Sequence, residues 1–207
     1  MKLLKQANGN LPRTEVDKKR MIEEAAKHYA GFLTALGFDY KSDPNSDDTP
    51  HRVAKAWVND IVWGSMNEQP KITQFPNPNY KGMVFQGDID VISLCSHHNL
   101  PFTGKAYVAY VPKPGGEVVG LSKLNRIVDW YARRPQLQEE LTQQIHDFVS
   151  EKISNDGVIV MIKAKHTCCS NRGIGHDSTM MTAAPSGLFL SNEGGCKDEF
   201  YQFINRL

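Results

Sequence analysis

The chain has 207 residues, 40% of them hydrophobic and 23% charged, with a formal net charge of +1. This composition suits one sizeable folded domain, or a smaller domain with an extension, and excludes disorder throughout. The balanced charge argues against a general nucleic-acid surface, and no apolar run reaches the roughly twenty residues that a membrane helix needs. The first residues lack the apolar core of a signal peptide, so we expect a cytoplasmic protein.

The first third of the chain predicts two helices. Apolar residues recur at helical spacing from Val16 to Leu36, and Gly37 follows as a typical helix stop. Thr49 and Pro50 then begin a second helix, the threonine as N-cap and the proline in the first turn, where a missing N–H costs little. We therefore expect the chain to open with an arm and a helical region.

Strands and helices follow one another in the rest of the chain. The predicted elements are a strand from Met83 to Cys95, a strand over 105–111 with a hairpin turn at 114–116 and its return at 118–119, helices from Ser122 and from Pro135, a strand from Val158 to His166, a strand within 180–190 and a closing helix within 198–207. This order indicates an α+β fold with a mostly antiparallel sheet. We expect an N-terminal arm and helical region over residues 1–81, which ends in a loop, and a second domain over residues 82–207.

Two short clusters carry metal-ligand residue types. Residues 95–98 read Cys-Ser-His-His and residues 166–168 read His-Thr-Cys, and each cluster stands at the end of a predicted strand. Cys-x-x-His spacing lets two side chains reach one ion from a single turn, and His-x-Cys places two side chains on the same face of an extended strand. Thiolate and imidazole are the ligands that tetrahedral Zn²⁺ prefers.

We expect one zinc held by Cys95, His98 and Cys168 with the fourth position open, as in catalytic sites. Spacing alone does not say which histidine of the pair is the ligand; the Cys-x-x-His step favours His98 and leaves His97 to face a substrate. His97 and His166 can titrate near neutrality, and we expect at least one of them to transfer protons. The alternative is that they only orient the ligands.

Basic residues are spread along the chain where they could gather around a polyphosphate. Lys123 and Arg126 are three apart on the helix from Ser122, so they share a face at its positive end. Glu139, after Gln138, could accept two N–H bonds from a guanine edge, although a charged helix surface is the ordinary interpretation. The other cationic candidates are Arg52, Lys55 and Arg172.

Several segments occur in the order known from one protein family. They are Thr49–Pro50 with Arg52–Lys55, Cys95–His98 with Pro101–Phe102, Gly120–Lys123 with Asn125–Val128, Arg134–Glu139 with Leu141–Ile145, and His166–Cys168 with Arg172–Gly173. On these segments, from about the first helix to the C-terminus, the chain resembles GTP cyclohydrolase I. The resemblance implies an enzyme that converts GTP and water into 7,8-dihydroneopterin triphosphate and formate, for folate, pterin or deazapurine synthesis.

The resemblance also implies the tunnelling fold, in which a four-stranded antiparallel sheet with two helices on one side follows an N-terminal helical region. In the family, five subunits form a barrel and two pentamers stack into a homodecamer. The active sites lie at subunit interfaces, so we expect GTP and further copies of the chain as partners, and neither nucleic acid nor membrane.

Matched position by position, Cys95, His98 and Cys168 correspond to the zinc ligands of the family. His166 matches the imidazole proposed to protonate N7 of the purine, and His97 matches the second catalytic histidine. The matching substrate-binding residues are Arg52, Lys55, Ser122, Lys123, Arg126 and Arg172 for the triphosphate, and Gln138 and Glu139 for the guanine. In this chemistry zinc-activated water attacks C8, formate leaves, and the opened ribose rearranges and recloses.

Two positions depart from the family pattern. Ser96 stands where the family usually has glutamate, so a charge is lost beside the metal. Cys169 is an unusual second thiol, which could compete for the metal or oxidise with Cys168. Three other interpretations remain: a purine- or pterin-binding relative without turnover, a structural zinc module with Cys169 as fourth ligand, and a reductase of the same fold class.

Overall fold

The computed structural model describes residues 2–77 and 79–207. Met1 and Pro78, which the sequence predictions place in the arm and in the loop before residue 82, lie outside the described residues. The chain divides into two compact units, Met1–Glu68 and Gln69–Leu207. The division predicted from the sequence falls later, after residue 81, and the catalytic role of the second part stays a proposal.

The first unit is built from helices. Its elements are α1 (Glu15–Ala35), α2 (Thr49–Ala56), the π-helical turn η1 (Trp57–Ile61) and α3 (Trp63–Met66). Thr14 and Asp17 bond reciprocally in a capping box at the start of α1, and Gly37 follows its end with a φ of 83°. The N-cap of α2 is Asp48 and not Thr49, because the first intrahelical bond runs from the N–H of Arg52 to the carbonyl of Asp48.

The second unit is organised by one sheet, with the strand order β5-β2-β3-β6-β7 among the described residues. The strands are β2 (Val84–Cys95), β3 (Pro101–Pro112), β5 (Pro135–Gln136), β6 (Asn155–His166) and β7 (Thr179–Pro185). The four long strands pair antiparallel, and the short β5 pairs parallel with the end of β2. The sheet thus has β5 in addition to the four strands expected, because residues 135–136 are extended and the following helix begins only at Gln138.

A separate two-stranded sheet pairs β1 (Gln74–Pro76) with β4 (Glu117–Val119). The sequence predicted instead that the residues of β4 return along the preceding strand as a hairpin. That expectation was wrong because β2 and β6 already occupy both edges of β3, and the chain turns away through Gly115 to pair with β1.

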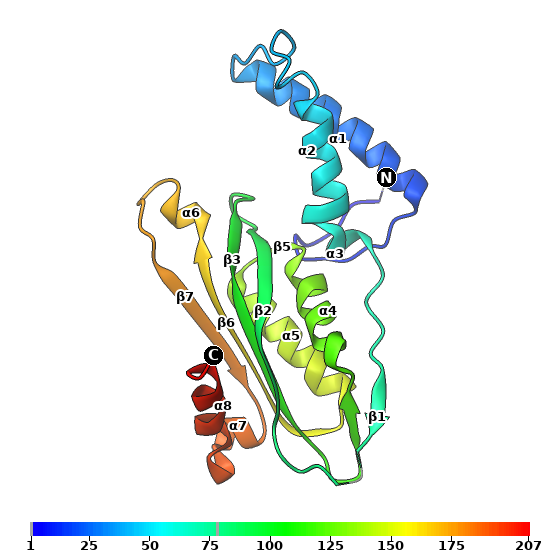
Figure 1. The fold of residues 1–207 in the computed structure, drawn as a ribbon. Coiled ribbons are helices and arrows are strands. Elements are labelled where there is room, and N and C mark those ends of the chain that lie inside the picture. The colour runs from blue at the N-terminus through cyan, green and yellow to red at the C-terminus, as the bar shows by residue number, and fades with distance from the viewer. Residues whose placement is uncertain (1, 78) are drawn as a thin grey trace. The chain divides into compact units, whose positions relative to one another are not determined.

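Helices cover both faces of the main sheet (Figure 1). The helices α4 (Leu121–Ala132) and α5 (Gln138–Lys152) pack on one face, and α7 (Leu188–Ser191) and α8 (Cys196–Ile204) pack against the other, with the 3₁₀ turn η2 (Glu193–Gly195) between them in sequence. Successive side chains of β3 point to opposite faces of the sheet, so this strand contributes to both hydrophobic cores. Ala106, Val108 and Tyr110 face α4 and α5, whereas Tyr107, Ala109 and Val111 join the core with Phe189 and Phe200.

Among the described helices, none is both long enough and apolar enough to cross a membrane. The predicted N-cap of α4, Ser122, lies inside the helix; the N-cap is Gly120, which is extended, and Leu121 opens the first turn.

Candidate metal centre and active site

Cys95 and His98 come from the tight turn that joins β2 to β3. Cys95 is the last residue of β2 and is buried, and its carbonyl oxygen accepts hydrogen bonds from the N–H of His98 at 3.3 Å and of Asn99 at 2.8 Å. Asn99 has a φ of 54°, a conformation that asparagine tolerates better than most residues. The turn folds His98 back toward the cysteine, as the Cys-x-x-His spacing predicts.

Cys168 comes from the helical turn α6 (Thr167–Ser170), which follows the end of β6 at His166. The prediction that His166 and Cys168 share one face of an extended strand was therefore wrong. The strand stops at His166 because the next residues turn toward β3, where the hydroxyl of Thr167 donates a hydrogen bond of 2.6 Å to the carbonyl oxygen of Pro101. The helical turn still directs Cys168 toward Cys95.

The structure brings Cys95, His98 and Cys168 together, with their candidate ligand atoms within 4.8 Å of one another. Burial raises the pKa of the Cys168 thiol to about 11, and the neighbouring thiols of Cys95 and Cys169 act in the same direction. Two thiols this close ionise together only with a cation between them. Two sulfurs and one ring nitrogen are the donor set that suits Zn²⁺, so these residues fit the predicted ion.

Two further histidines lie beside this cluster. His97 is exposed, and its Nδ1 is 3.8 Å from the sulfur of Cys95. The ring of His166 stacks on Phe102, with the ring centroids 4.5 Å apart and the planes inclined by 10°. Burial lowers the pKa of His166, and the charge of Glu139 opposes that shift. His166 is thus held in one position and is biased toward its neutral form.

Gln138 is the partner of His166, with its Oε1 at 2.8 Å from the histidine Nε2. The glutamine is only 1% exposed, and its Nε2 lies within hydrogen-bond distance of the carbonyls of Ile162 and Met180 and of the hydroxyl of Thr182. Its side-chain amide is therefore already engaged inside the fold, and its predicted contact with guanine stays a prediction. Glu139, the next residue, is exposed.

The predicted triphosphate residues of α4 line two neighbouring hollows. Ser122 and Lys123 line one of about 650 Å³, and Arg126 lines another of about 350 Å³ together with three aspartates. Gln86 and Asn125 belong to both hollows, and their side chains are joined by a hydrogen bond of 2.5 Å. The first turns of α4 thus gather one hydroxyl and two cations.

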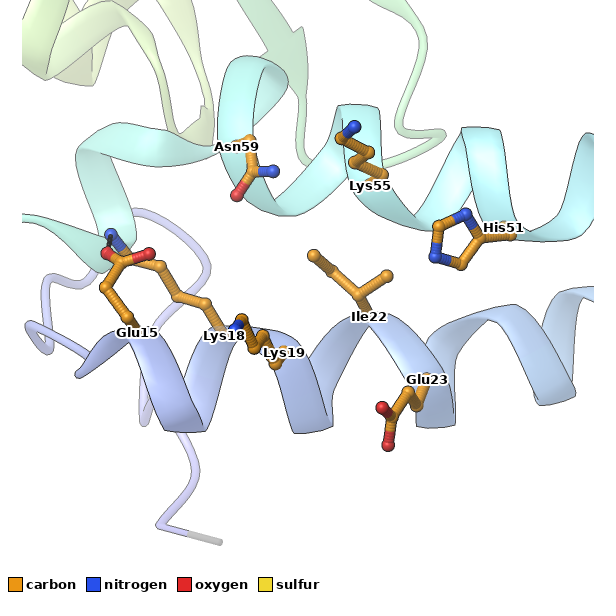
Figure 2. A pocket seen from close by; sticks show the side chains of 8 residues that line it. All are labelled: Glu15, Lys18, Lys19, Ile22, Glu23, His51, Lys55 and Asn59. Carbon is orange, nitrogen blue, oxygen red and sulfur yellow. Dashed lines mark hydrogen bonds and ion pairs between the residues drawn. The ribbon is translucent and has the colours of Figure 1, made fainter.

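Arg172 lies elsewhere, with Nη1 in hydrogen-bond contact with Nε2 of His98 in the metal cluster. Arg52 and Lys55 belong to the first unit, so their part in the same anion site stays a prediction. Arg52 pairs with Asp48 at 3.2 Å. Lys55 lines a groove of about 280 Å³ between α1 and α2, where His51 and Lys55 on α2 face Ile22 on α1 (Figure 2).

Residues 25–205 match the family model described as GTP cyclohydrolase I. The chain belongs to the GTP cyclohydrolase I family. Its relatives include GTP cyclohydrolase 1 of Flavobacterium johnsoniae, 40% identical over 195 residues, which covers 92% of this chain and 84% of that protein. The enzyme of Vibrio parahaemolyticus is 42% identical over 179 residues, with 85% and 80% covered. That of Porphyromonas gingivalis is 39% identical over 197 residues, with 93% and 98% covered.

The family and the enzyme class inferred from the sequence motifs are thereby confirmed. Among solved structures, the archaeosine synthase QueF-Like in its apo form matches with a TM-score of 0.44 and 22% identity, covering 53% of this chain and 97% of that one. This similarity is too low to assign a function to this member of the GTP cyclohydrolase I family.

Ser96 and Cys169, the two departures from the family pattern, have different surroundings. The N–H of Ser96 donates to the carbonyl of Gln136 at 3.2 Å, which ties the turn after β2 to β5. Cys169 is exposed and its thiol contacts that of Cys168, but within the described chain the cluster of candidate ligands consists of Cys95, His98 and Cys168.

Sequence reasoning missed two residues of the packing around His166: Phe102, which stacks on its ring, and Thr182, which contacts its partner Gln138. Phe102 was noted only as part of a motif, although its register opposite His166 in the β3–β6 pair is what stacks the two rings. Thr182 was not singled out, because its role depends on the pairing of β7 with β6, which no local pattern reveals. The alternation of buried residues along β3 and β6 is the signal that could have paired Phe102 with His166.

Proposed function

We propose that this protein converts GTP and water into 7,8-dihydroneopterin triphosphate and formate at the cluster formed by Cys95, His98, Cys168, His97 and His166. The observation that carries the proposal is the convergence of three candidate ligand atoms within 4.8 Å, beside two histidines, in a chain of this family. The product would enter folate, pterin or deazapurine synthesis, and we propose a cytoplasmic location for the enzyme.

Zn²⁺ is the proposed resident ion, and Cys95, His98 and Cys168 would hold it. When bound, it would supply a Lewis acid that makes water nucleophilic near neutral pH. Three protein ligands leave a fourth position, which is the pattern of catalytic sites. The position of Cys169 outside the described ligand cluster favours this function over a structural zinc module.

The side chains of the protein supply the proton transfers. His166, whose pKa is lowered by burial, gives its proton readily to N7 of the purine, and protonation there makes C8 electron-poor and open to attack by water. His97, next to Cys95, is the second proton-transfer group in the later steps that release formate and reclose the ring.

Substrate binding is proposed to combine cations with one carboxylate. The N–H groups and the hydroxyl at the start of α4 suit an anion, and Lys123 and Arg126 add charge to the triphosphate site. Glu139, exposed in the first turn of α5, accepts N–H bonds from the guanine edge, next to Gln138. Arg172 beside His98, and Arg52 and Lys55 from the first unit, complete the set.

We further propose the tunnelling fold and a homodecamer of two stacked pentamers, with the active sites at subunit interfaces. Two features support self-association. Strand β7 is the outer strand of the described sheet and has an edge available to another chain. Helix α1 contains no buried residue and exposes Phe32 and Val16, which suits a helix that packs against further copies of this chain.

The test is to incubate purified, zinc-loaded protein with GTP and to measure formate together with pterin fluorescence after oxidation. We expect equal amounts of both products, and we expect a strong chelator to stop their formation. GTP binding by the zinc-loaded protein without any formate would instead support the purine-binding relative. Light scattering of the same sample decides whether the protein is a decamer.

A further inference from the structure

The side-chain amide of Gln138 has a single orientation that satisfies its surroundings. Its nitrogen lies 3.1 Å from the carbonyl oxygen of Ile162 and 3.3 Å from that of Met180. Carbonyl oxygens only accept hydrogen bonds, so the nitrogen must face them. The flipped amide would set oxygen against oxygen at a site that is 1% exposed, where water cannot compensate.

Two threonine hydroxyls agree with this orientation. The hydroxyl of Thr142 donates to the backbone carbonyl of Gln138 at 2.8 Å, so its proton is not available to Thr182. The hydroxyl of Thr182, 2.6 Å away, therefore donates to Thr142, and its lone pair accepts from Nε2 of Gln138 at 3.1 Å. The three hydrogen bonds therefore donate in one direction: from the glutamine nitrogen to Thr182, from Thr182 to Thr142, and from Thr142 to the backbone carbonyl of Gln138.

The oxygen of the amide is consequently the atom that meets His166. Oε1 of Gln138 lies 2.8 Å from Nε2 of His166 and can only accept, so the ring proton of neutral His166 sits on Nε2. We propose that Gln138 is a positioning residue, which holds neutral His166 in the Nε2-protonated tautomer and so keeps the lone pair of the ring on Nδ1.

Three elements fix this arrangement. Gln138 begins α5, His166 ends β6, and Phe102 of β3 lies opposite His166 in the strand register and stacks on its ring. The neighbouring Glu139 acts on His166 through its charge, whereas Gln138 acts through the direction of one hydrogen bond. The inference rests on the proposed function only for the role of His166 in proton transfer.

The tautomer is measured directly by magic-angle-spinning NMR of the substrate-free protein, loaded with zinc and labelled with ¹⁵N in its histidine rings. We expect His166, assigned by the loss of its signals in His166→Gln, to show a protonated Nε2 and an unprotonated Nδ1. Gln138→Met keeps the length of the side chain but removes the hydrogen bond. We expect this variant to show a mixture of tautomers and to lose about tenfold to a hundredfold in kcat.

Gln143→Met is the matched control, because Gln143 lies on the same helix, is exposed and contacts Asp147 instead of His166. We expect it to keep the wild-type His166 signals and kcat. A wild-type spectrum with the proton on Nδ1 would overturn the proposal, and so would a single Nε2-protonated form in Gln138→Met. The wild-type spectrum decides even if the variant does not fold, and it does so whether or not the protein turns over GTP.

Discussion

The hydroxyl of Thr167 donates a hydrogen bond of 2.6 Å to the carbonyl oxygen of Pro101. Pro101 follows the turn that carries Cys95 and His98, and Thr167 immediately precedes Cys168. Together with the pairing of Phe102 opposite His166, this bond joins the two halves of the candidate metal cluster, so it helps to set the distance between candidate ligands that are far apart in the sequence.

Replacing Thr167 with valine should weaken zinc binding while the fold is retained. The loss of one hydrogen bond costs about 0.5–1.5 kcal/mol, and the loosened turn should lower zinc affinity roughly tenfold. Competition with a chromophoric chelator measures the affinity, and thermal unfolding measures the stability. Ser170→Ala in the same turn is the control. Unchanged affinity in Thr167→Val would show that the turn holds its position without this bond.

Replacing Cys168 with serine should remove zinc and formate production together, because a hydroxyl is a much poorer zinc ligand than a thiolate. Cys169→Ser is the matched control and should retain both, since Cys169 lies outside the described ligand cluster. Metal content by elemental analysis and formate release provide the two readouts. Zinc loss in Cys169→Ser, with zinc retained in Cys168→Ser, would reverse the ligand assignment.

Replacing Lys123 with glutamine should raise KM for GTP and leave kcat nearly unchanged, because the cation is predicted to bind the triphosphate and not the reacting purine. A hydrogen bond to a charged group contributes about 1.5–3 kcal/mol, so KM should rise about tenfold to a hundredfold. Lys113→Gln, at an exposed lysine after β3, is the control. A fall in kcat with constant KM would place Lys123 at the reacting centre instead.

Replacing Arg134 with lysine should destabilise the second unit. Its guanidinium lies 3.6 Å from the ring centroid of Trp130 and 4.8 Å from that of Tyr131, and burial lowers its pKa to about 10. Lysine cannot stack as a plane, so we expect a loss of about 1–2 kcal/mol in the free energy of unfolding.

The adjacent Arg133→Lys is the control, because Arg133 pairs with Asp129 near the surface and should cost less than about 1 kcal/mol. Urea unfolding compares the two variants. Equal losses would mean that aromatic stacking adds nothing to the stability.

Cys196 should react slowly with iodoacetamide at neutral pH. Burial raises its pKa, and the charges of Glu199 and Glu193 act in the same direction, so the reactive thiolate is scarce until the pH exceeds the ordinary thiol value of about 8.5. In the zinc-loaded protein, the exposed Cys169 should be modified first. Mass spectrometry of peptides from samples labelled across a pH series measures both rates. Rapid labelling of Cys196 at neutral pH would contradict this expectation.

Local spacing was sufficient for much of the fold and for the turn that brings Cys95 and His98 together. The helix before Gly37 and the strands that end at Cys95 and His166 follow from periodicity and stop signals. Cys-x-x-His spacing describes a turn correctly because both residues lie within it. The roles of these residues in binding zinc and in proton transfer stay predictions.

Features that depend on distant partners could not be read in the same way. Cys168 was expected on a strand, since nothing near it in the sequence reveals the bond between Thr167 and Pro101. The pairing of β4 with β1 joins segments on either side of two long strands. Gln138 stands beside an exposed glutamate at a helix start, and only the packing of β6 and β7 explains why its side chain is buried.

The two residues of β5 connect the helices α4 and α5 and also pair with the end of β2. These residues follow α4 in the chain and pair with the backbone of Leu94 and Cys95. The helix α5, which begins with Gln138 and Glu139, comes next. The backbone of Cys95 and the start of α5, where the predicted guanine residue Glu139 lies, are thus linked through one short strand. A substitution that displaces β5 is therefore expected to disturb the cysteine at the end of β2 and the first turn of α5 together.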